Sequence, residues 1–413
     1  MGAMKTPGVY IVEKNAFPNS VVEVATAVPA FIGYTEKALN GNKSLLKTPW
    51  RITSMAEFHS YFGGAPTPKF RISVSAGEPV VTCERKHTLY YHMLFFYANG
   101  GGPCYIVSVG NYDEDPDASG FTAGIETLLK EQEPTMVVIP EAVNLDADNC
   151  QKVQEAMLKH CGYDMKNRFA IFDVFNGDKG RKDPEAGDVI LDFRERIGSN
   201  YLNFGAAYYP WMNTSILQES DVDLSNITED TLDVLRKLLV DQIEKQLGAS
   251  ADEDEQAKID ARKAEYNSWF EQIIQEDADK MILHKTLLVI SPLYKEIMKE
   301  LLLQINCLPV SAAMAGVYTM VDNTRGVWKA PANVSVANAV SPTVNLTHGD
   351  QEELNVPLSG KAINAIRTFI GEGIKVWGAR TLDGNSLDWR YINVRRTMIM
   401  LEESIKNAAR AYV

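Results

Sequence analysis

The residue types that most often do catalytic or metal chemistry are scattered along this chain. None of its six histidines belongs to an H-E-x-x-H pair, and none has cysteine partners at the spacing of metal ligands. The sequence also lacks the G-x-S-x-G elbow of many hydrolases and the G-x-x-x-x-G-K-S/T loop of NTPases. We therefore expect no catalytic residue, no metal site and no bound cofactor, and we predict that the protein is not an enzyme.

The cysteines indicate a reducing compartment. They are five in number, spread along the chain and without a C-x-x-C pair, so neither a disulfide framework nor a zinc ribbon is expected. They are Cys83, Cys104, Cys150, Cys161 and Cys307.

Two glycine-rich segments and one acidic pair are the remaining candidates for a binding site. Residues 100–102 could form an anion-binding nest, but a helix stop before a strand needs the same glycines. Residues 371–373 lack the third glycine of a dinucleotide fingerprint. Glu402 and Glu403 are neighbours in a predicted helix, so their side chains diverge by about 100°. Local structure explains each of these features better than ligand binding does.

Size and charge narrow the class of protein further. The chain has 413 residues, 45% hydrophobic and 23% charged, which predicts two or three folded domains. A net charge of -13 argues against a general nucleic-acid binder, because phosphate binding needs a dominant positive face. No apolar run approaches the ~18 residues of a membrane span, and residues 1–14 do not read as a secretion signal. We expect synthesis and folding in the cytoplasm and no insertion into a membrane.

Helices and apolar strands alternate through the first half of the chain. After strand-like residues at 21–33 and a short helix at 54–62, the pattern becomes regular, and it favours βαβ units around a mostly parallel sheet. The expected helices are 89–98, 121–131, 149–160 and 188–199, and the expected strands are 105–109, 136–139, 169–174 and 206–209.

The alternation stops at Trp211, and residues 219–283 are highly charged with sparse apolar positions. This segment is predicted to be a peripheral insertion of two amphipathic helices. The sheet is expected to resume with a strand at 286–290, followed by a helix at 292–305.

The last part of the chain is predicted to contain a helix at 361–370, a strand at 374–378 and a final helix from residue 392. Apolar residues recur along the final helix at a spacing that predicts one buried stripe. They are Val394, Met398, Leu401, Ile405 and Ala408. At the other end, residues 9–13 read as an isolated strand, able to pair within its own domain or with the sheet edge of a neighbour.

Three blocks of sequence resemble the tail sheath proteins of contractile phages, R-type pyocins and extracellular contractile injection systems. The first is D-N-T-R-G-V-W-K-A-P-A-N at 322–333. The second joins I-N-A-I-R at 363–367 to I-K-V-W-G-A-R-T-L at 374–382. The third joins W-R-Y-I-N-V-R-R at 389–396 to L-E-E-S-I at 401–405. The blocks occur in the order of the family, and the resemblance covers nearly the whole chain except the charged insertion.

The resemblance implies a multidomain sheath fold. We expect an N-terminal arm at 1–20, a middle α/β domain at 21–218 and 284–332, the helical insertion at 219–283 and a C-terminal core domain at 333–413. Sheath chains usually continue past the L-E-E-S-I helix into further strands and an arm, so the last domain is expected to be incomplete. The connection at 357–361 is longer than is usual in the family.

The function implied is structural. Sheath subunits polymerise around an inner tube, assemble on a baseplate under a cap or terminator protein, and contract to drive the tube through a target envelope. The protein is then expected in the cytoplasm during assembly and later in a phage tail or a contractile particle. Two alternatives stay open: another structural tail or capsid component, and an α/β ligand-binding protein or enzyme.

The resemblance also assigns roles to residues. Residues of the arm are expected to pair with neighbouring subunits: Val9, Tyr10, Ile11 and Val12. Basic residues of the C-terminal domain are candidates to face an acidic tube: Lys361, Arg367, Lys375, Arg395 and Arg396. The motif residues expected to be structural are Arg325, Gly326, Trp328, Trp377, Gly378 and Arg380. Each of these arginines could instead pair with a carboxylate of its own domain, and either tryptophan could anchor a core.

Overall fold

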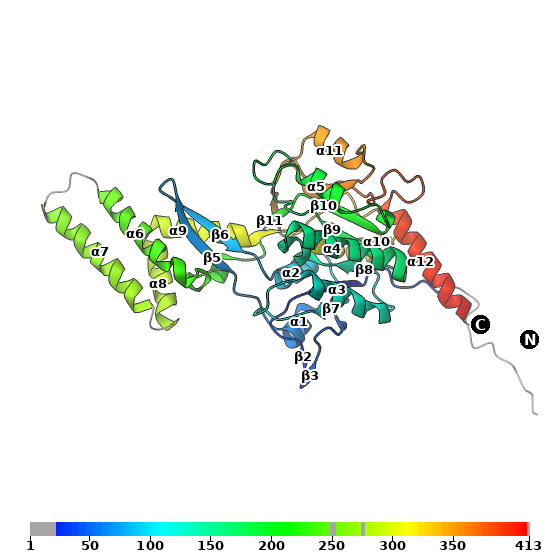
Figure 1. The fold of residues 1–413 in the computed structure, drawn as a ribbon, viewed down its shortest axis with the longest axis horizontal. Helices are drawn as coiled ribbons and strands as arrows, with labels where there is room; N and C mark the ends of the chain where they lie inside the picture. The colour runs from blue at the N-terminus through cyan, green and yellow to red at the C-terminus, as the bar shows by residue number, and fades with distance from the viewer. Residues whose placement is uncertain (1–21, 248–252, 274–276, 411–413) are drawn as a thin grey trace, which may run out of the picture.

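The computed structural model describes residues 22–247, 253–273 and 277–410, and it has two parts of unequal size (Figure 1). The larger part is a wide sheet with helices on both faces, and the smaller part is a module of helices and a hairpin at one end. The predicted arm at 1–20, including Val9, Tyr10, Ile11 and Val12, lies outside the described residues.

A nine-stranded sheet forms the centre of the larger part, in the order β13-β16-β15-β10-β9-β8-β1-β7-β4. Neighbours from β15 to β7 are parallel, and the antiparallel strands lie towards the two edges. Five central strands are buried along their whole length, because helices cover both faces. The predicted α/β class with a mostly parallel sheet is confirmed. The strands are β1 (Pro29–Gly33), β4 (Trp50–Ile52), β7 (Cys104–Ser108), β8 (Met136–Val138), β9 (Phe169–Asp173), β10 (Gly205–Tyr209), β13 (Val334–Ser335), β15 (Ile363–Phe369) and β16 (Gly373–Val376).

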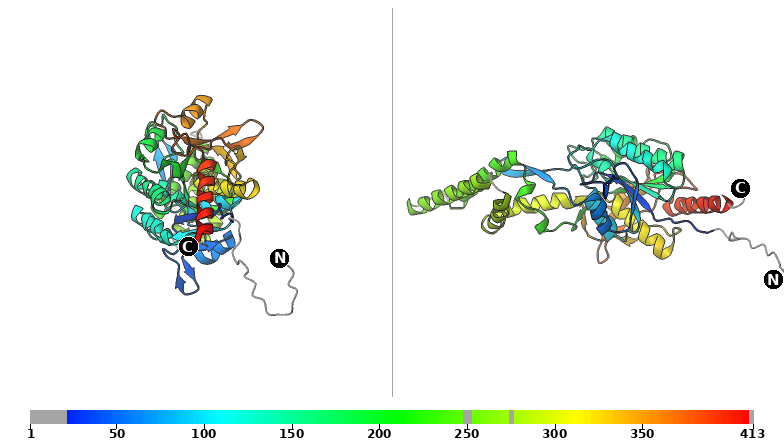
Figure 2. Two further views of the ribbon diagram at one scale, coloured as in Figure 1. Left: turned by 90° about the vertical axis from the view of Figure 1, so that its right-hand side faces the viewer. Right: turned by 90° about the horizontal axis from the view of Figure 1, so that it is seen from below.

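Alternating side chains of these strands enter two separate hydrophobic cores. In β1, Ala30 and Ile32 belong to one core and Phe31 to the other, as the alternation along a strand requires. The two helix layers that complete these cores lie on opposite faces of the sheet (Figure 2). The first layer contains α3 (Ala118–Thr127), α4 (Ala147–Lys159), α5 (Val189–Arg196) and α11 (His348–Asn355). The second contains α1 (Met55–Phe62), α2 (Leu89–Ala98) and α10 (Ser311–Arg325).

The C-terminal region extends the same sheet. β15 pairs in parallel with β10, and Ile363 lies opposite Ala207. The predicted division at residue 333 therefore crosses a continuous sheet, and the division into domains stays a prediction. The remaining α-helices and strands of this part are α12 (Ile392–Ala409), the hairpin of β2 (Leu39–Asn40) and β3 (Lys43–Ser44), and a small sheet of β11 (Met212–Thr214), β12 (Cys307–Leu308) and β14 (Ala339–Pro342).

Two predicted elements are wrong in type. Residues 361–370 contain the strand β15 instead of a helix, because their apolar residues pack into the sheet beside β10. Residues 286–290 end the helix α8 (Asp277–Ile290) instead of resuming the sheet. Short apolar runs fit either period, and tertiary contacts decided both cases.

The smaller part is a module with a hydrophobic core of its own. It combines the hairpin of β5 (Lys69–Ser75) and β6 (Glu78–Glu84) with α6 (Leu232–Leu247), α7 (Glu253–Ile273), α8 and α9 (Pro292–Asn306). Gln304 of α9 accepts from the Cys83 N–H at 3.1 Å and donates to the Val81 carbonyl at 2.8 Å, as a neighbouring strand would. The predicted insertion at 219–283 thus shares its core with residues far from it in sequence.

We predict that Leu239→Ala weakens this module without loosening the main sheet. Leu239 is fully buried in the module core, so the free energy of unfolding of the module should fall by about 2–5 kcal/mol. Hydrogen exchange read by mass spectrometry should show lost protection in α6 and α9 but not in β9. The control is Leu303→Ala, which removes a side chain that is 48% exposed and should change stability by about 0.5 kcal/mol or less. Equal loss of protection in β9 would show that the two parts unfold as one.

Two buried carboxylates hold helix N-termini beside the sheet. Glu141 accepts the N–H groups of Thr88 at 2.6 Å and Leu89 at 2.9 Å, at the start of α2, and that of Tyr34 at 2.9 Å, directly after β1. Asp173 accepts those of Val310 and Ser311 at 2.7 and 2.8 Å, at the start of α10. The positive end of a helix dipole stabilises a nearby anion. Burial nevertheless dominates, and it raises the pKa of Glu141 to about 7 and the pKa of Asp173 to about 6.

The raised pKa of Glu141 predicts a pH-dependent stability. Between its ordinary value of 4.5 and about 7, the folded chain keeps a proton that the unfolded chain releases, so the free energy of unfolding falls as pH rises. This group contributes a decline of at most about 1.4 kcal/mol per pH unit between pH 5 and pH 7, and urea unfolding measures it as the difference in slope between the unmodified chain and Glu141→Gln. Glu141→Gln should flatten that decline, and Glu229→Gln, at an exposed position, should not. Identical slopes in Glu141→Gln and the unmodified chain would contradict the assignment.

Candidate assembly region

The three sequence blocks with the family resemblance fold into one connected region. The first block forms the end of α10 and the turn after it, the second forms β15 and β16, and the third begins α12. The Ile392 N–H donates to the Ala379 carbonyl at 3.0 Å, which joins the third block to the second. The Asn393 side chain donates to the Trp328 carbonyl at 2.9 Å, which joins the third block to the first.

A buried ion pair fixes α12 against α10. The two terminal nitrogens of the Arg396 guanidinium donate to the carboxylate oxygens of Asp322 at 2.9 and 2.6 Å. Both side chains are nearly inaccessible, with exposed fractions of 4% and 2%. Arg396 also donates to the Thr26 carbonyl at 2.9 Å and lies 4.8 Å from the ring centre of Tyr318, whose hydroxyl contacts that of Tyr208 at 2.7 Å. One side chain therefore joins α12, α10, β10 and the segment that leads into β1.

The neighbouring Arg395 is held between aromatic rings. Its guanidinium carbon lies 4.0 Å from the centre of the Phe204 ring and 4.8 Å from that of Trp389. Burial lowers the pKa of Arg395, and Glu402 lies 3.9 Å away. These contacts give the buried Arg395 guanidinium a cation–π attraction that replaces part of its lost hydration.

Asn364 of β15 clamps the second block. Its side-chain oxygen accepts from the Arg380 N–H at 2.7 Å, and its nitrogen donates to the carbonyls of Arg380 and Ala207 at 2.8 and 3.2 Å. Gly378 passes so close that an added Cβ would lie 2.7 Å from the Asn364 oxygen. A larger residue at 378 would displace the Asn364 side chain from these hydrogen bonds. Steric exclusion therefore explains the glycine at this position.

The other motif residues lie nearer the surface. Gly326 ends α10 with φ of +87°, and an added Cβ would lie 2.3 Å from the Trp328 ring. Trp328 is 59% exposed and Trp377 is 41% exposed, so the interpretation that these tryptophans anchor a core is wrong. Trp377 packs its ring 4.5 Å from that of Phe369, and Arg325 is an exposed residue in the last turn of α10.

The candidates to face a tube have partners within the chain. Arg395 and Arg396 are 5% and 4% exposed, so in this structure neither can present its charge to another protein, which corrects the expectation for these two. Lys375 contacts Glu372 and is 17% exposed, and Lys361 donates to the Arg194 carbonyl. Arg367 lies with its guanidinium carbon 5.7 Å from the Phe369 ring centre. For Lys361, Arg367 and Lys375 the role stays a prediction.

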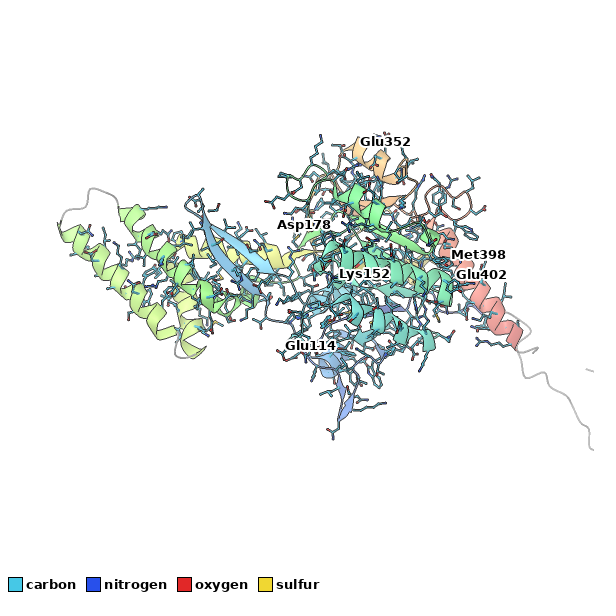
Figure 3. All side chains as sticks on the ribbon, viewed as in Figure 1. Glu114, Lys152, Asp178, Glu352, Met398 and Glu402 are labelled. Carbon is cyan, nitrogen blue, oxygen red and sulfur yellow. The ribbon has the colours of Figure 1, made fainter. Side chains whose placement is uncertain are left out.

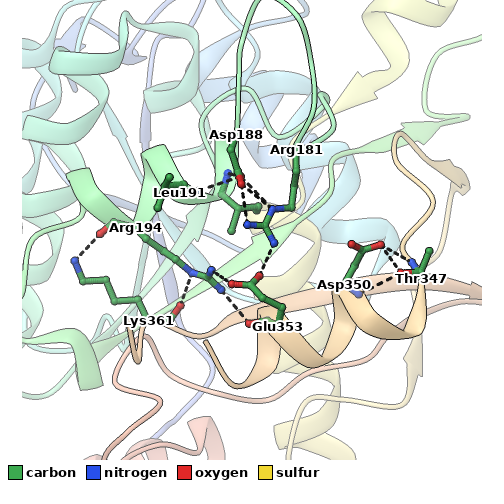
Figure 4. A network of polar contacts seen from close by, with 9 residues as sticks. Arg181, Asp188, Leu191, Arg194, Thr347, Asp350, Glu353 and Lys361 are labelled. Atoms are coloured by element: carbon green, nitrogen blue, oxygen red, sulfur yellow. Dashed lines mark hydrogen bonds and ion pairs between the residues drawn. The ribbon is translucent and has the colours of Figure 1, made fainter. Parts of the chain in front are cut away.

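A second polar network, which the sequence analysis missed, ties α11 to α5 (Figure 4). Glu353 accepts from Arg181 at 2.6 Å and from the buried Arg194, and Arg181 also donates to Asp188 at 2.8 Å. Arg194 donates to the Lys361 carbonyl at 3.0 Å. The pKa of Arg181 is raised, mainly by its hydrogen bond to Asp188. Glu353 is 159 residues from Arg194 and 172 residues from Arg181 in the sequence, so no rule based on local spacing predicts this network.

The apolar row of α12 faces outward, which corrects the prediction of a buried stripe. Val394, Met398, Leu401 and Ile405 are 41%, 39%, 44% and 58% exposed. Met398 and the nearby Glu402 are labelled on this helix in Figure 3, where it extends from the end of the body. The buried face instead contains Ile392, Arg395, Arg396, Ile399, Met400 and Ser404.

The described residues offer no sign of metal chemistry or of a membrane span. Within them, no group of three or more histidine, cysteine, aspartate or glutamate side chains could hold a metal ion. No helix in the same ranges combines the length and apolar character needed to cross a bilayer.

Comparison with known proteins relates this arrangement to other structures. No family model matches the sequence, and no curated protein matches it. A solved structure of the PVC sheath complex, an extracellular contractile injection system in its contracted state, contains a chain that is 24% identical, with a TM-score of 0.55. The match covers 100% of this chain and 76% of that one. The contracted helical sheath of the anti-feeding prophage gives 24% identity and a TM-score of 0.56, over 100% of this chain and 78% of that one.

The chain has the fold of a contractile sheath protein. A chain in the six-fold symmetrised baseplate structure of the anti-feeding prophage is also similar, at 25% identity and a TM-score of 0.52, over 100% of this chain and 77% of that one. The family resemblance predicted from three short blocks is thus confirmed as a likeness of fold along the whole chain. In this sheath fold, the motif residues Asn364, Gly378 and Arg396 make contacts within the subunit.

We predict that Asp322→Ala strongly destabilises the sheath fold. It leaves the Arg396 guanidinium buried without its carboxylate, which should lower the free energy of unfolding by about 3–5 kcal/mol. Urea unfolding measures the loss. The double variant Asp322→Leu with Arg396→Met should recover much of it, because the uncompensated charge is gone. A single variant as stable as the original chain would mean that water or another group replaces the carboxylate.

Proposed function

We propose that this chain is a structural subunit of a contractile sheath. It polymerises around an inner tube and contracts to drive that tube through a target envelope. The observation that supports this most is the likeness of fold over 100% of the chain to subunits of two contracted sheaths. The three sequence blocks that resemble the family add support, because hydrogen bonds join them into one region of the fold.

The proposed work of the subunit is mechanical and uses no cofactor or catalytic residue. The body of the subunit can rotate as one unit without rearranging its packed side chains. Two contacts fix it in this way: the buried ion pair of Arg396 with Asp322, and the ion pairs of Glu353. Free energy stored during assembly is released as subunits gain contact area, so no nucleotide is required. The proposed site of assembly is the cytoplasm, followed by residence in a phage tail or contractile particle.

The proposed partners are other sheath subunits, an inner tube protein, a baseplate and a cap or terminator protein. Relatives of this fold were solved in a sheath complex and in a baseplate structure. The candidate tube-facing residues that keep a partly accessible side chain are Lys361, Arg367 and Lys375. Attraction between such cations and an acidic tube would be weak and screened by salt, which suits parts that must slide.

The main test is co-expression of the natural gene with the tube and baseplate genes beside it. Negative-stain electron microscopy should then show hollow cylinders with a cogwheel cross-section. Folded protein that never forms such cylinders with its tube and baseplate would overturn the proposal.

We further predict that residues 4–16 link subunits by strand pairing. In the co-expression experiment, deleting them should leave a folded subunit and abolish the cylinders. Val12→Pro should act in the same direction, because proline has no N–H to donate to a neighbouring strand. Lys14→Ala, in the same segment, should assemble normally. Cylinders of normal number and length from the deletion variant would exclude this role for the arm.

A further inference from the structure

A cavity of about 270 Å³ lies where the module joins the larger part of the chain (Figure 1). One side of it comes from the base of the β5–β6 hairpin and the end of α9, which belong to the module. The other side comes from the larger part, including the start of α2 and the strand β12. The volume is close to the ~300 Å³ lower limit of pockets that bind small molecules. The cavity is therefore large enough for a small organic ligand.

Two cations in the wall of this cavity have no carboxylate partner among the described residues: Lys69 and Arg85. They are neighbours at the base of the hairpin, because Arg85 directly follows Glu84, which pairs with Lys69 across β5 and β6. Arg85 donates to the Gln304 carbonyl at 3.1 Å. Lys69 donates to the Ser225 carbonyl at 2.8 Å. Each group has further N–H donors, so both can bind an additional acceptor.

Other polar groups of the wall are already engaged within the chain. Glu84 is paired with an arginine at 2.7 Å and Lys86 with an aspartate at 2.9 Å. The hydroxyls of Tyr91 and Tyr112 each donate to a backbone carbonyl at 2.9 Å. The Asn144 amide donates to a threonine hydroxyl at 3.0 Å. The charges left for a ligand are therefore positive, although the chain as a whole has 54 acidic and 41 basic residues.

Much of the remaining wall is apolar. It is formed by rings and a branched side chain: Pro66, Pro68, Tyr91, Tyr112, Leu308 and Pro309. A carboxylate attached to an apolar group fits both features, because the anion pairs with the cations while the apolar group leaves water. A bare inorganic anion would leave the apolar wall without a partner. We propose that this cavity binds a small organic carboxylate with an apolar body, and that Arg85 and Lys69 hold its carboxylate.

A ligand in this position would contact both parts of the chain at once. The module and the sheet have distinct hydrophobic cores, so contacts at their junction fix how the two are placed. A ligand that binds only the joined arrangement stabilises it by mass action. The inference goes beyond the proposed sheath function and does not depend on assembly.

The test titrates the full chain with para-fluorophenylbutyrate and follows the probe by fluorine NMR. We expect saturable binding with a Kd on the order of 1 mM or below. Arg85→Gln should weaken binding at least about 10-fold, because charge-assisted hydrogen bonds to the carboxylate are lost. Arg262→Gln, which changes an exposed arginine of α7 in the same module, is the matched control and should leave the Kd unchanged.

Two related probes test the chemical class of the ligand. The alcohol that corresponds to the probe lacks the anion, and butyrate lacks the ring, so each should bind at least about 10-fold more weakly than the probe. Absence of saturable binding of the probe overturns the proposal. Equal binding of the alcohol and the acid, or binding that is insensitive to Arg85→Gln, also overturns it.

A second variant decides the outcome if Arg85→Gln disturbs the fold. Thr67 is an exposed residue of the cavity wall, so Thr67→Trp should fill the cavity and weaken probe binding at least about 10-fold with both cations in place. Thr67→Ala is its control and should bind normally. Saturating probe should also slow hydrogen exchange at 84–88 and 304–309 but not in α7. Normal binding by Thr67→Trp, or protection only outside these segments, contradicts the site. Cylinder formation is a separate readout, so the sheath proposal can hold when this site fails, and the reverse.

Discussion

The buried ion pair between Arg396 and Asp322 is the contact on which the C-terminal half of the structure depends. A charge pair with exposed fractions of 4% and 2% is stable only when its hydrogen bonds are complete, and Arg396 completes them with two carboxylate oxygens and the Thr26 carbonyl. This geometry demands that α12, α10 and the entry to β1 keep one relative position. Because a buried ion pair is often no more stabilising than an apolar replacement, we hypothesise that this one mainly selects a single packing of the three segments.

The need of buried polar groups for complete hydrogen bonds also explains why particular residues stand at positions of the motif blocks. The Asn364 side chain donates to carbonyls on two chain segments. A side chain at position 378 would collide with Asn364, so this position requires glycine. Arg395 needs the faces of Phe204 and Trp389. A subunit that is proposed to move as a unit benefits from such contacts, because a body with alternative packings would absorb the motion instead of transmitting it.

The module at the other end is joined to the body in a different way. Its apolar core is distinct from the two cores of the sheet, although Tyr91 of α2 and Leu308 of β12 contribute to it. Gln304 pairs through both ends of its amide with the Cys83 N–H and the Val81 carbonyl on the open edge of β6. Closing that edge matters for a protein that is proposed to bind copies of itself by strand addition, because an unpaired strand in the wrong place would compete for the same partners.

The sequence by itself predicted the parallel α/β core, the absence of known catalytic motifs and the likeness to sheath proteins, because apolar periodicity and ordered motifs are local properties of the chain. It did not determine that 361–370 pairs as a strand, since its apolar residues fit a helix equally well until β10 lies beside them. Nor did it separate the two sides of α12. One side of the helix has the apolar residues Val394 and Met398, and the other has the cations Arg395 and Arg396. A helix usually buries its apolar side, so the sequence predicted burial of Val394 and Met398. Tertiary structure reversed that choice, because Asp322, Tyr318 and Phe204 meet only in the fold and provide the arginines with partners that no spacing along the chain reveals.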